Sequence, residues 1–272
     1  MGSFTDYMVG KEDASLFLVN YYPRFSWLID NLPENYMKQA VRRQITSPTA
    51  PTGLVAPPNV DRYFYGFTDA DQLTFNLLWG SFDAEAARAT ATAAADEDGL
   101  GYSALDQTVG GLDLFRNEQR VFGISADLLV DVKVGFADPV ANFETVVAGV
   151  NGEADTYPSM NENYRMLTER MDGHNVQILP NEAKNTWNIG TTAFARQFTY
   201  ASERASLGQE VMVWESEPGE DEVRSKAEAN SGIVSGLNGD IDSVEIDGRL
   251  VTVDYGPITN SSLYRGSGYT QD

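Results

Sequence analysis

Few residues of this chain have the type and spacing that catalysis requires. The only histidine, His174, follows Gly173, and no Gly-x-Ser-x-Gly sequence offers a nucleophile for a Ser-His-Asp arrangement. A lone histidine beside a predicted helix end is more often a capping or core residue. The chain has no cysteine, which excludes disulfides, zinc–thiolate sites and thiol nucleophiles. We therefore predict no catalytic residue and no enzymatic activity.

One glycine-containing sequence resembles a nucleotide-binding motif only by its letters. Gly99-Leu-Gly-Tyr-Ser-Ala104 fits the pattern G-x-G-x-x-A, which binds a dinucleotide when it joins a strand to a helix. Here it follows an Ala-rich predicted helix and three acidic residues, 96–98, which would repel a pyrophosphate. No Walker A loop is present either, so the sequence predicts no bound cofactor.

A second sequence partly matches a calcium-binding loop. With Asn238 as first ligand, Asp240 and Asp242 occupy the third and fifth positions. The sixth position is Ser243 and the twelfth is Arg249, where an EF-hand has glycine and glutamate. The sequence therefore excludes an EF-hand and leaves two alternatives, a weak cation site or an ordinary acidic turn. We predict no specific metal site.

The charge of the chain suggests its environment. Asp and Glu number 40 against 19 Lys and Arg, giving a net charge of −21 and a pI of about 4.3. Such a surface could repel other anions, bind solvent cations weakly, or suit a very salty solvent, where the Debye length falls to about 3 Å at 1 M. Because the acids are scattered and lysine is scarce, we favour a halophilic source. Without a basic patch, no sequence-specific nucleic-acid partner is expected.

The segment 58–98 is the clearest structural module. Val60–Phe67 is rich in aromatic and β-favouring residues, Thr68–Asp71 has turn chemistry, and Leu73–Trp79 alternates between apolar and polar residues. An Ala- and Thr-rich run then predicts a helix that Ser81 can cap, with Asp83 and Glu85 in its first turn. We expect a hairpin followed by a helix.

Other elements are predicted with the same rules. The expected helices are 34–45 and 161–171; the expected strands are 130–134, 143–150, 175–179 and 210–214, with a hairpin of 244–246 and 250–253 around Asp247-Gly248. Residues 15–22 suit a strand or a buried helix, and 192–207 suit either state. Residues 46–58, 99–106, 151–159 and 215–222 are expected to be loops.

These elements indicate an α+β fold with mostly antiparallel β sandwich or barrel elements and a few short helices. We predict three parts: an N-terminal arm and helix with a Pro-rich linker over 1–57, a central hairpin and helix module over 58–150, and a second β-rich region over 151–272 with an acidic loop and a polar tail. No N-terminal signal sequence and no apolar run of about 20 residues is present, so neither secretion by a leader nor a membrane partner is expected.

Part of the chain resembles a known family. Arg43-Gln-Ile-Thr-Ser-Pro-Thr-Ala-Pro, then Asp61-Arg-Tyr-Phe-Tyr-Gly66, then Leu73-Thr-Phe-Asn-Leu-Leu78 and a helix with an acidic start are similar to the organisation of tail-tube proteins of tailed viruses. The likeness covers about residues 43–97. It implies a β-barrel lining through which copies stack as rings.

Combined with the acidic surface, this resemblance implies a non-enzymatic virion protein of a virus infecting a salt-loving archaeon. Its expected partners are copies of itself and other virion proteins, and its expected location is the virion, assembled in the host cytoplasm. We rank a tail component (tube, neck or baseplate) ahead of a capsid-shell protein because the helix after Ser81 is short and Ala/Thr-rich. A halophilic enzyme or binding protein is the alternative from another class, and it predicts a deep pocket with perturbed carboxylates.

Overall fold

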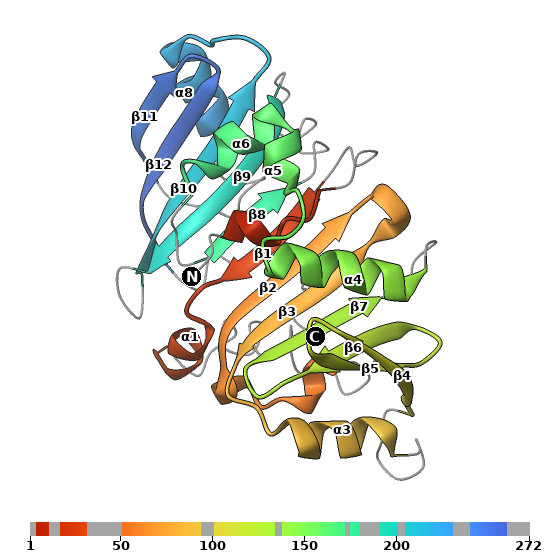
Figure 1. The fold of residues 1–272 in the computed structure, drawn as a ribbon. Helices are drawn as coiled ribbons and strands as arrows, with labels where there is room; N and C mark the ends of the chain where they lie inside the picture. The colour runs from red at the N-terminus through yellow and green to blue at the C-terminus, as the bar shows by residue number, and fades with distance from the viewer. Residues whose placement is uncertain are drawn as a thin grey trace. The chain divides into compact units, whose positions relative to one another are not determined.

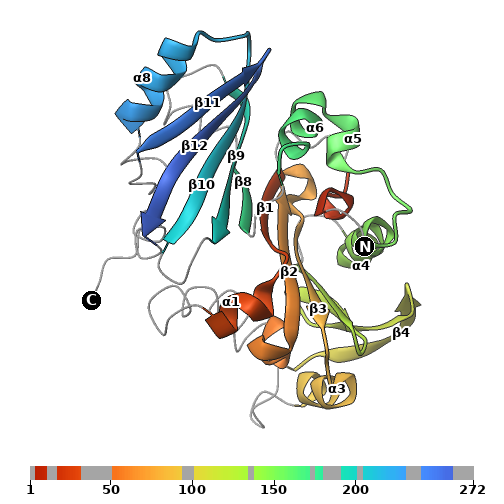
Figure 2. The ribbon, with the colours of Figure 1, turned by 90° about the vertical axis from the view of Figure 1, so that its left-hand side faces the viewer.

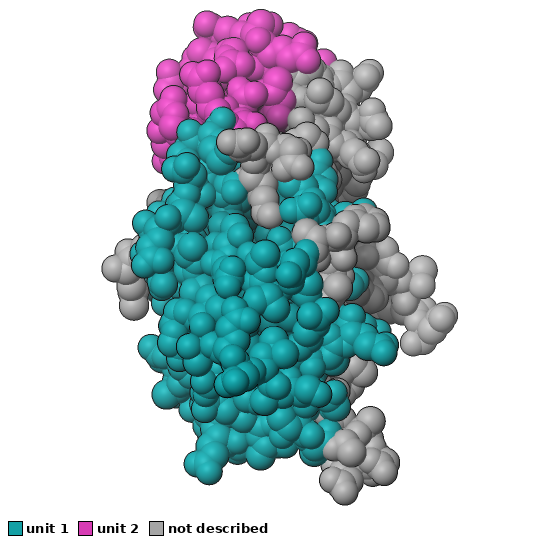
Figure 3. All heavy atoms as spheres, turned by 45° about the vertical axis from the view of Figure 1, so that its right-hand side comes forward, with its two compact units in different colours: residues 1–30, 40–160 teal, residues 31–39, 161–272 magenta. Residues whose placement is uncertain are grey.

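The computed structural model describes residues 4–10, 17–31, 51–93, 101–133, 138–171, 175–179, 191–200, 205–230 and 240–259. The chain divides into two compact units (Figure 3). Unit 1 comprises Met1–Asp30 and Ala40–Met160, and unit 2 comprises Asn31–Gln39 and Asn161–Asp272. The mixed α+β class with antiparallel strands, predicted from the sequence, is confirmed.

Unit 1 is built on an antiparallel sheet with the strand order β1-β2-β3-β7-β6-β5-β4 (Figure 1). The strands are β1 (Phe17–Tyr22), β2 (Val60–Thr68), β3 (Thr74–Gly80), β4 (Ser103–Val109), β5 (Leu112–Arg116), β6 (Arg120–Ile124) and β7 (Leu128–Lys133). Short turns join the pairs β2–β3, β4–β5, β5–β6 and β6–β7, whereas β1–β2 and β3–β7 bring together strands that are far apart in the chain.

The predicted hairpin is confirmed at the centre of this sheet. Strands β2 and β3 pair in a register that places Tyr65 opposite Asn76. The turn between them is closed by the Thr68 amide, which donates to the Leu73 carbonyl at 2.9 Å. Asp71 and Gln72 have φ values of 54° and 50°, a left-handed turn that short polar residues tolerate better than apolar ones.

The boundaries of unit 1 differ from the predicted division at 57 and 150. Strand β1 lies within the predicted N-terminal arm, yet it pairs with β2 from Phe17↔Thr68 to Tyr22↔Tyr63 and so belongs to the same sheet. At the other end, the amide of Tyr157, in the short helix α5 (Tyr157–Met160), donates to the Met8 carbonyl. Backbone pairing therefore ties both flanking segments to the module.

Two helices of unit 1 depart from the sequence-based expectation. The prediction of a strand over 143–150 was wrong, because helix α4 (Pro139–Val150) occupies this segment. Asp138 caps it by accepting from the Val140 amide at 2.9 Å, and Pro139 suits the first helical turn. Helix α3 (Ala84–Thr92) begins after Asp83, whose side chain accepts from the Ala86 amide at 3.0 Å, so Asp83 and not Ser81 is its cap.

Helices cover both faces of the unit 1 sheet, as the edge-on view in Figure 2 shows for α1 (Phe25–Asn31) and α4. On the α1 face, Phe25 packs against Tyr22 and Tyr63, with ring centroids 6.1 and 5.9 Å away. On the α4 face, Phe64 stacks on Phe75 at 5.7 Å. Aromatic side chains therefore fill much of the core, where each contributes a large buried area.

Unit 2 contains a second antiparallel sheet, with the order β11-β12-β10-β9-β8. The strands are β8 (Asn175–Leu179), β9 (Thr191–Tyr200), β10 (Ala205–Trp214), β11 (Ile241–Asp247) and β12 (Leu250–Thr259). Helices α6 (Glu162–Thr168) and α8 (Glu220–Asn230) pack on opposite faces of it (Figure 2). The predicted hairpin at Asp247-Gly248 is confirmed, and Gly248 has the positive φ, 59°, that this turn requires.

The remaining predictions for unit 2 have mixed outcomes. The ambiguous segment 192–207 contributes to strands β9 and β10. Its sequence lacks a clear alternation of apolar and polar residues because both faces are buried, as Phe194 and Ala195 show. The loop predicted over 215–222 was wrong for its last three residues, because α8 begins at Glu220. Among its described side chains α8 buries only Val223 and Ala227, so the sequence shows little apolar pattern there.

Likewise, β4 starts at Ser103 within the predicted loop 99–106; its nearly complete exposure gives no apolar alternation to detect. The predicted helix 34–45 lies outside the described residues.

Candidate functional site

The sequence motifs considered as candidate sites do not converge in the structure. His174 and Asn238 lie outside the described residues, while Asp240 and Asp242 are exposed at the start of β11. Among the residues that the structure describes, no group of three or more His, Asp or Glu is placed to hold a metal ion. Three other features have the burial or shape of a site: two buried carboxyl groups and one hollow.

The first buried carboxyl group belongs to Asp131 at the centre of unit 1. Its side chain is 0% exposed, and its Oδ2 accepts from Asn76 Nδ2 at 2.9 Å. The same oxygen forms an ion pair with the Arg120 guanidinium. Asn76 in turn accepts from the Tyr63 hydroxyl at 2.9 Å. A polar chain thus crosses the adjacent strands β2, β3, β7 and β6.

Burial has the largest effect on the pKa values of the titratable groups in this polar chain. Loss of solvent raises the pKa of Asp131 to about 6, against the opposing effects of the Arg120 charge and the Asn76 hydrogen bond. Burial also raises the pKa of Tyr63 well above its usual value. Asp131 Oδ1 has no hydrogen-bond partner, so the carboxylate is only half satisfied. The arrangement fixes strand register at a considerable electrostatic cost.

Glu210 supplies the second buried carboxyl group, in the core beneath α8. Its side chain is 0% exposed, and Oε2 accepts from the Tyr255 hydroxyl at 2.7 Å. Burial raises the pKa of Glu210 to about 7, while the Tyr255 hydrogen bond and the charge of Arg196 on the paired strand act in the opposite direction. Its Oε1 has no hydrogen-bond partner.

A hollow of about 270 Å³, open to solvent, lies on unit 2. Its lining comes from four adjacent strands: Gln197 and Thr199 from β9, Leu207, Gly208 and Gln209 from β10, Asp242 from β11, and Asp254 and Tyr255 from β12. Neither Asp131 nor Glu210 lines it, so the carboxyl groups with raised pKa values are not aimed at its contents. The carboxylates that do line the hollow are Asp242 and Asp254.

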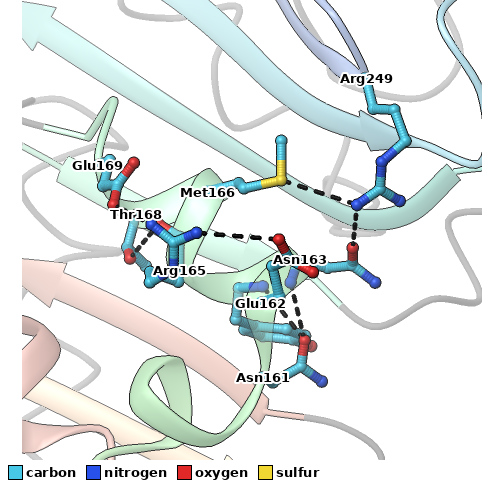
Figure 4. Close-up of polar contacts among 9 residues, drawn as sticks. Asn161, Glu162, Asn163, Arg165, Met166, Thr168, Glu169 and Arg249 are labelled. Atoms are coloured by element: carbon cyan, nitrogen blue, oxygen red, sulfur yellow. Dashed lines mark hydrogen bonds and ion pairs between the residues drawn. The ribbon is translucent and has the colours of Figure 1, made fainter.

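The polar contacts around α6, shown in Figure 4, have a structural role. Asn161 caps the helix by accepting from the amides of Asn163 and Tyr164. Arg249, in the turn of the β11–β12 hairpin, donates to Asn163 Oδ1 at 3.3 Å and to the Trp214 carbonyl at 3.4 Å. These bonds fasten the hairpin turn to α6 and to the end of β10.

Sequence patterns did not reveal these features. Asp131 sits in the alternating run Val130-Asp-Val-Lys133, which suggests an outward-facing acid. Its partners Asn76 and Arg120 are 55 and 11 residues away in the chain. Glu210 is likewise the first residue of the predicted strand 210–214, and nothing in the sequence distinguishes it from the exposed glutamates. An acidic residue within a strand can be recognised as buried only when the strands that pair with it are known.

Comparison with known proteins yields a likeness of fold. No protein-family model matches the chain, and no curated protein matches it. Three crystal forms of TP0453 resemble it in structure: form III has a TM-score of 0.58 at 11% identity, covering 98% of this chain and 97% of that one. Forms I and IV have TM-scores of 0.53 and 0.54 at 12% identity and cover 94% and 96% of this chain, and 93% and 94% of their own. The chain therefore has a fold similar to that of TP0453.

Proposed function

We propose that this chain is a non-enzymatic structural subunit that self-assembles at high salt, as a tail component of a virus infecting a salt-loving archaeon. The observation that carries self-assembly is the outer strand β4 of unit 1. Ser103, Ala104, Asp106, Gln107 and Thr108 are exposed, and the strand pairs with β5 on one side only within the described sheet. An exposed sheet edge is a template for pairing with another chain.

Charge distinguishes this edge from the outer strand of unit 2. Strand β11 carries Asp242, Glu245 and Asp247, all exposed, and acids on an edge oppose strand addition. Strand β4 carries only one acidic residue, Asp106. Edge-to-edge pairing through β4 therefore brings fewer like charges together, and high salt screens those that remain.

The acidic surface supports the high-salt part of the proposal. Helix α8 displays exposed Glu220, Asp221, Glu222 and Glu228. Paired copies with a net charge of −21 each would repel strongly at low ionic strength, whereas a Debye length of about 3 Å at 1 M removes most of that repulsion. Assembly is thus expected to require salt.

The choice of a tail component over a capsid shell rests on helix α3. It is 9 residues long, and its buried side chains are Ala87 and Ala91. Such a helix gives little apolar area with which to brace a shell. Within the described residues, each helix is too short or too polar to span a bilayer.

A proline scan of the two outer strands tests the proposed edge. Asp106 lies between Ala104 and Thr108, where the pairing of β4 with β5 shifts register. Proline is tolerated at such an irregularity but cannot donate a hydrogen bond to an added strand. We expect Asp106→Pro to reduce assemblies in about 3 M KCl to the monomer mass of 29.9 kDa, as measured by sedimentation velocity.

The matched control is Asp242→Pro, between Ile241 and Ser243, where β11 shifts register against β12. This variant removes the same charge from the other outer strand and should assemble like the natural protein. If Asp106→Pro folds and assembles normally, or if both variants lose assembly equally, β4 is not the interface.

A further inference from the structure

The hollow of unit 2 is lined by negative charge, which favours a cationic ligand. Two of its lining residues, Asp242 and Asp254, are carboxylates, and none of the lining residues that the structure describes is cationic. The remaining polar lining consists of amide and hydroxyl groups from Gln197, Gln209 and Thr199 among others. A cationic ligand would thus meet favourable charge, and the described lining residues place no competing positive charge beside it.

One wall of the hollow is already organised by hydrogen bonds. Gln197 Nε2 donates to Gln209 Oε1 and, at 3.0 Å, to the Arg170 carbonyl. Gln209 Nε2 donates to Asp254 Oδ1 at 2.7 Å, and Ser243 Oγ donates to Asp254 Oδ2 at 2.6 Å. Since a carboxylate offers about four lone-pair sites, Asp254 keeps capacity for a further donor. The wall is therefore fixed before a ligand arrives.

Leu207 adds an apolar surface to this otherwise polar hollow. Its side chain is 45% exposed, which is unusual for a large apolar residue in this chain, and it lines the hollow. A hydrocarbon segment resting on Leu207 would remove apolar surface from water. A bare metal ion would make no use of this contact, and the described residues place no three metal-ligating side chains together.

We infer that this hollow binds a small organic cation, a primary ammonium group attached to a short hydrocarbon chain. The ammonium group donates to Asp254 and lies beside Asp242, while the hydrocarbon packs on Leu207. A volume of about 270 Å³ is close to the lower end of the usual range for ligand pockets, about 300 Å³, and suits a molecule of this size. This binding does not depend on the proposed assembly.

Saturation-transfer NMR on the full chain tests the inference, because it detects weak ligands and works with large particles. The probe is n-butylammonium chloride, and n-butanol is its uncharged analogue. We expect saturable transfer to butylammonium and at least about tenfold weaker binding of butanol, since a hydrogen bond to a charged group contributes about 1.5–3 kcal/mol.

Asp254→Asn is expected to weaken butylammonium binding about tenfold. Asparagine can still accept from Gln209, so the wall is retained. The matched control is Glu215→Gln, which removes one exposed charge from outside the hollow and should bind like the natural protein. If Asp254→Asn does not fold, Asp242→Asn takes its place, with weaker binding again expected. Non-saturable transfer, equal binding of butanol, or unchanged binding in the hollow variants would overturn the inference.

Discussion

Replacing Arg120 with methionine should lower the free energy of unfolding by about 3–5 kcal/mol above pH 7, because it leaves the Asp131 carboxylate buried without its ion-pair partner. Methionine preserves much of the apolar stem of Arg120, whose side chain is only 21% exposed. Asn76 would remain as the hydrogen-bond donor to Oδ2. Urea denaturation at constant high salt measures the loss.

The expected loss depends on pH with a definite sign. Without Arg120, the pKa of Asp131 should rise above about 6, because the opposing positive charge is gone. As the pH falls below that value, the carboxyl group binds a proton and its burial costs less, so the difference from the natural protein should shrink.

The double variant Arg120→Met with Asp131→Asn provides the control. Neither charge is then buried, and asparagine can still accept from Asn76, so most of the stability should return. If the single variant is as stable as the natural protein, or if the double variant is no better than the single one, the ion pair does not have the role assigned to it.

Glu210→Gln should raise the free energy of unfolding by about 3 kcal/mol at pH 8 and have little effect near pH 4.5. Burial raises the pKa of Glu210 from 4.5 to about 7, so between these values the folded protein binds a proton that the unfolded chain has released. The free energy of unfolding of the natural protein therefore falls as pH rises through this window. Glutamine cannot ionise and still accepts from Tyr255, so the variant lacks this loss.

Urea denaturation at several pH values distinguishes the two proteins. The exposed Glu215→Gln variant serves as the charge-matched control and should follow the natural pH profile. A profile of Glu210→Gln parallel to the natural one would contradict the assigned burial penalty.

Local pattern was sufficient to predict the β2–β3 hairpin and the turn at Gly248. In both cases a turn residue lies between segments whose own alternation indicates strands, so no distant contact is needed. Helix α4 shows where this approach fails. Its apolar residues Phe143, Val146 and Val147 have helical spacing but end in an uninterrupted apolar run that also suits a buried strand, and only Asp138-Pro139 signals the helix start.

The candidate sites depend on contacts that no local pattern contains. The Asp131 chain joins four strands, and its two partners lie on different sides of Asp131 in the sheet. The hollow combines residues from 197 to 255 on four strands. Sequence could predict that strands occur in these regions, but not which of their polar residues meet, because pairing order and register are set by the whole sheet.

The mass of the natural protein in solution tests self-assembly at high salt most directly. We expect light scattering in about 3 M KCl to give particles many times the chain mass of 29.9 kDa, with rings or tubes visible by negative-stain electron microscopy. Closed shells would instead favour a capsid role within the same class. A uniform monomer at every protein concentration in the same salt would contradict the account.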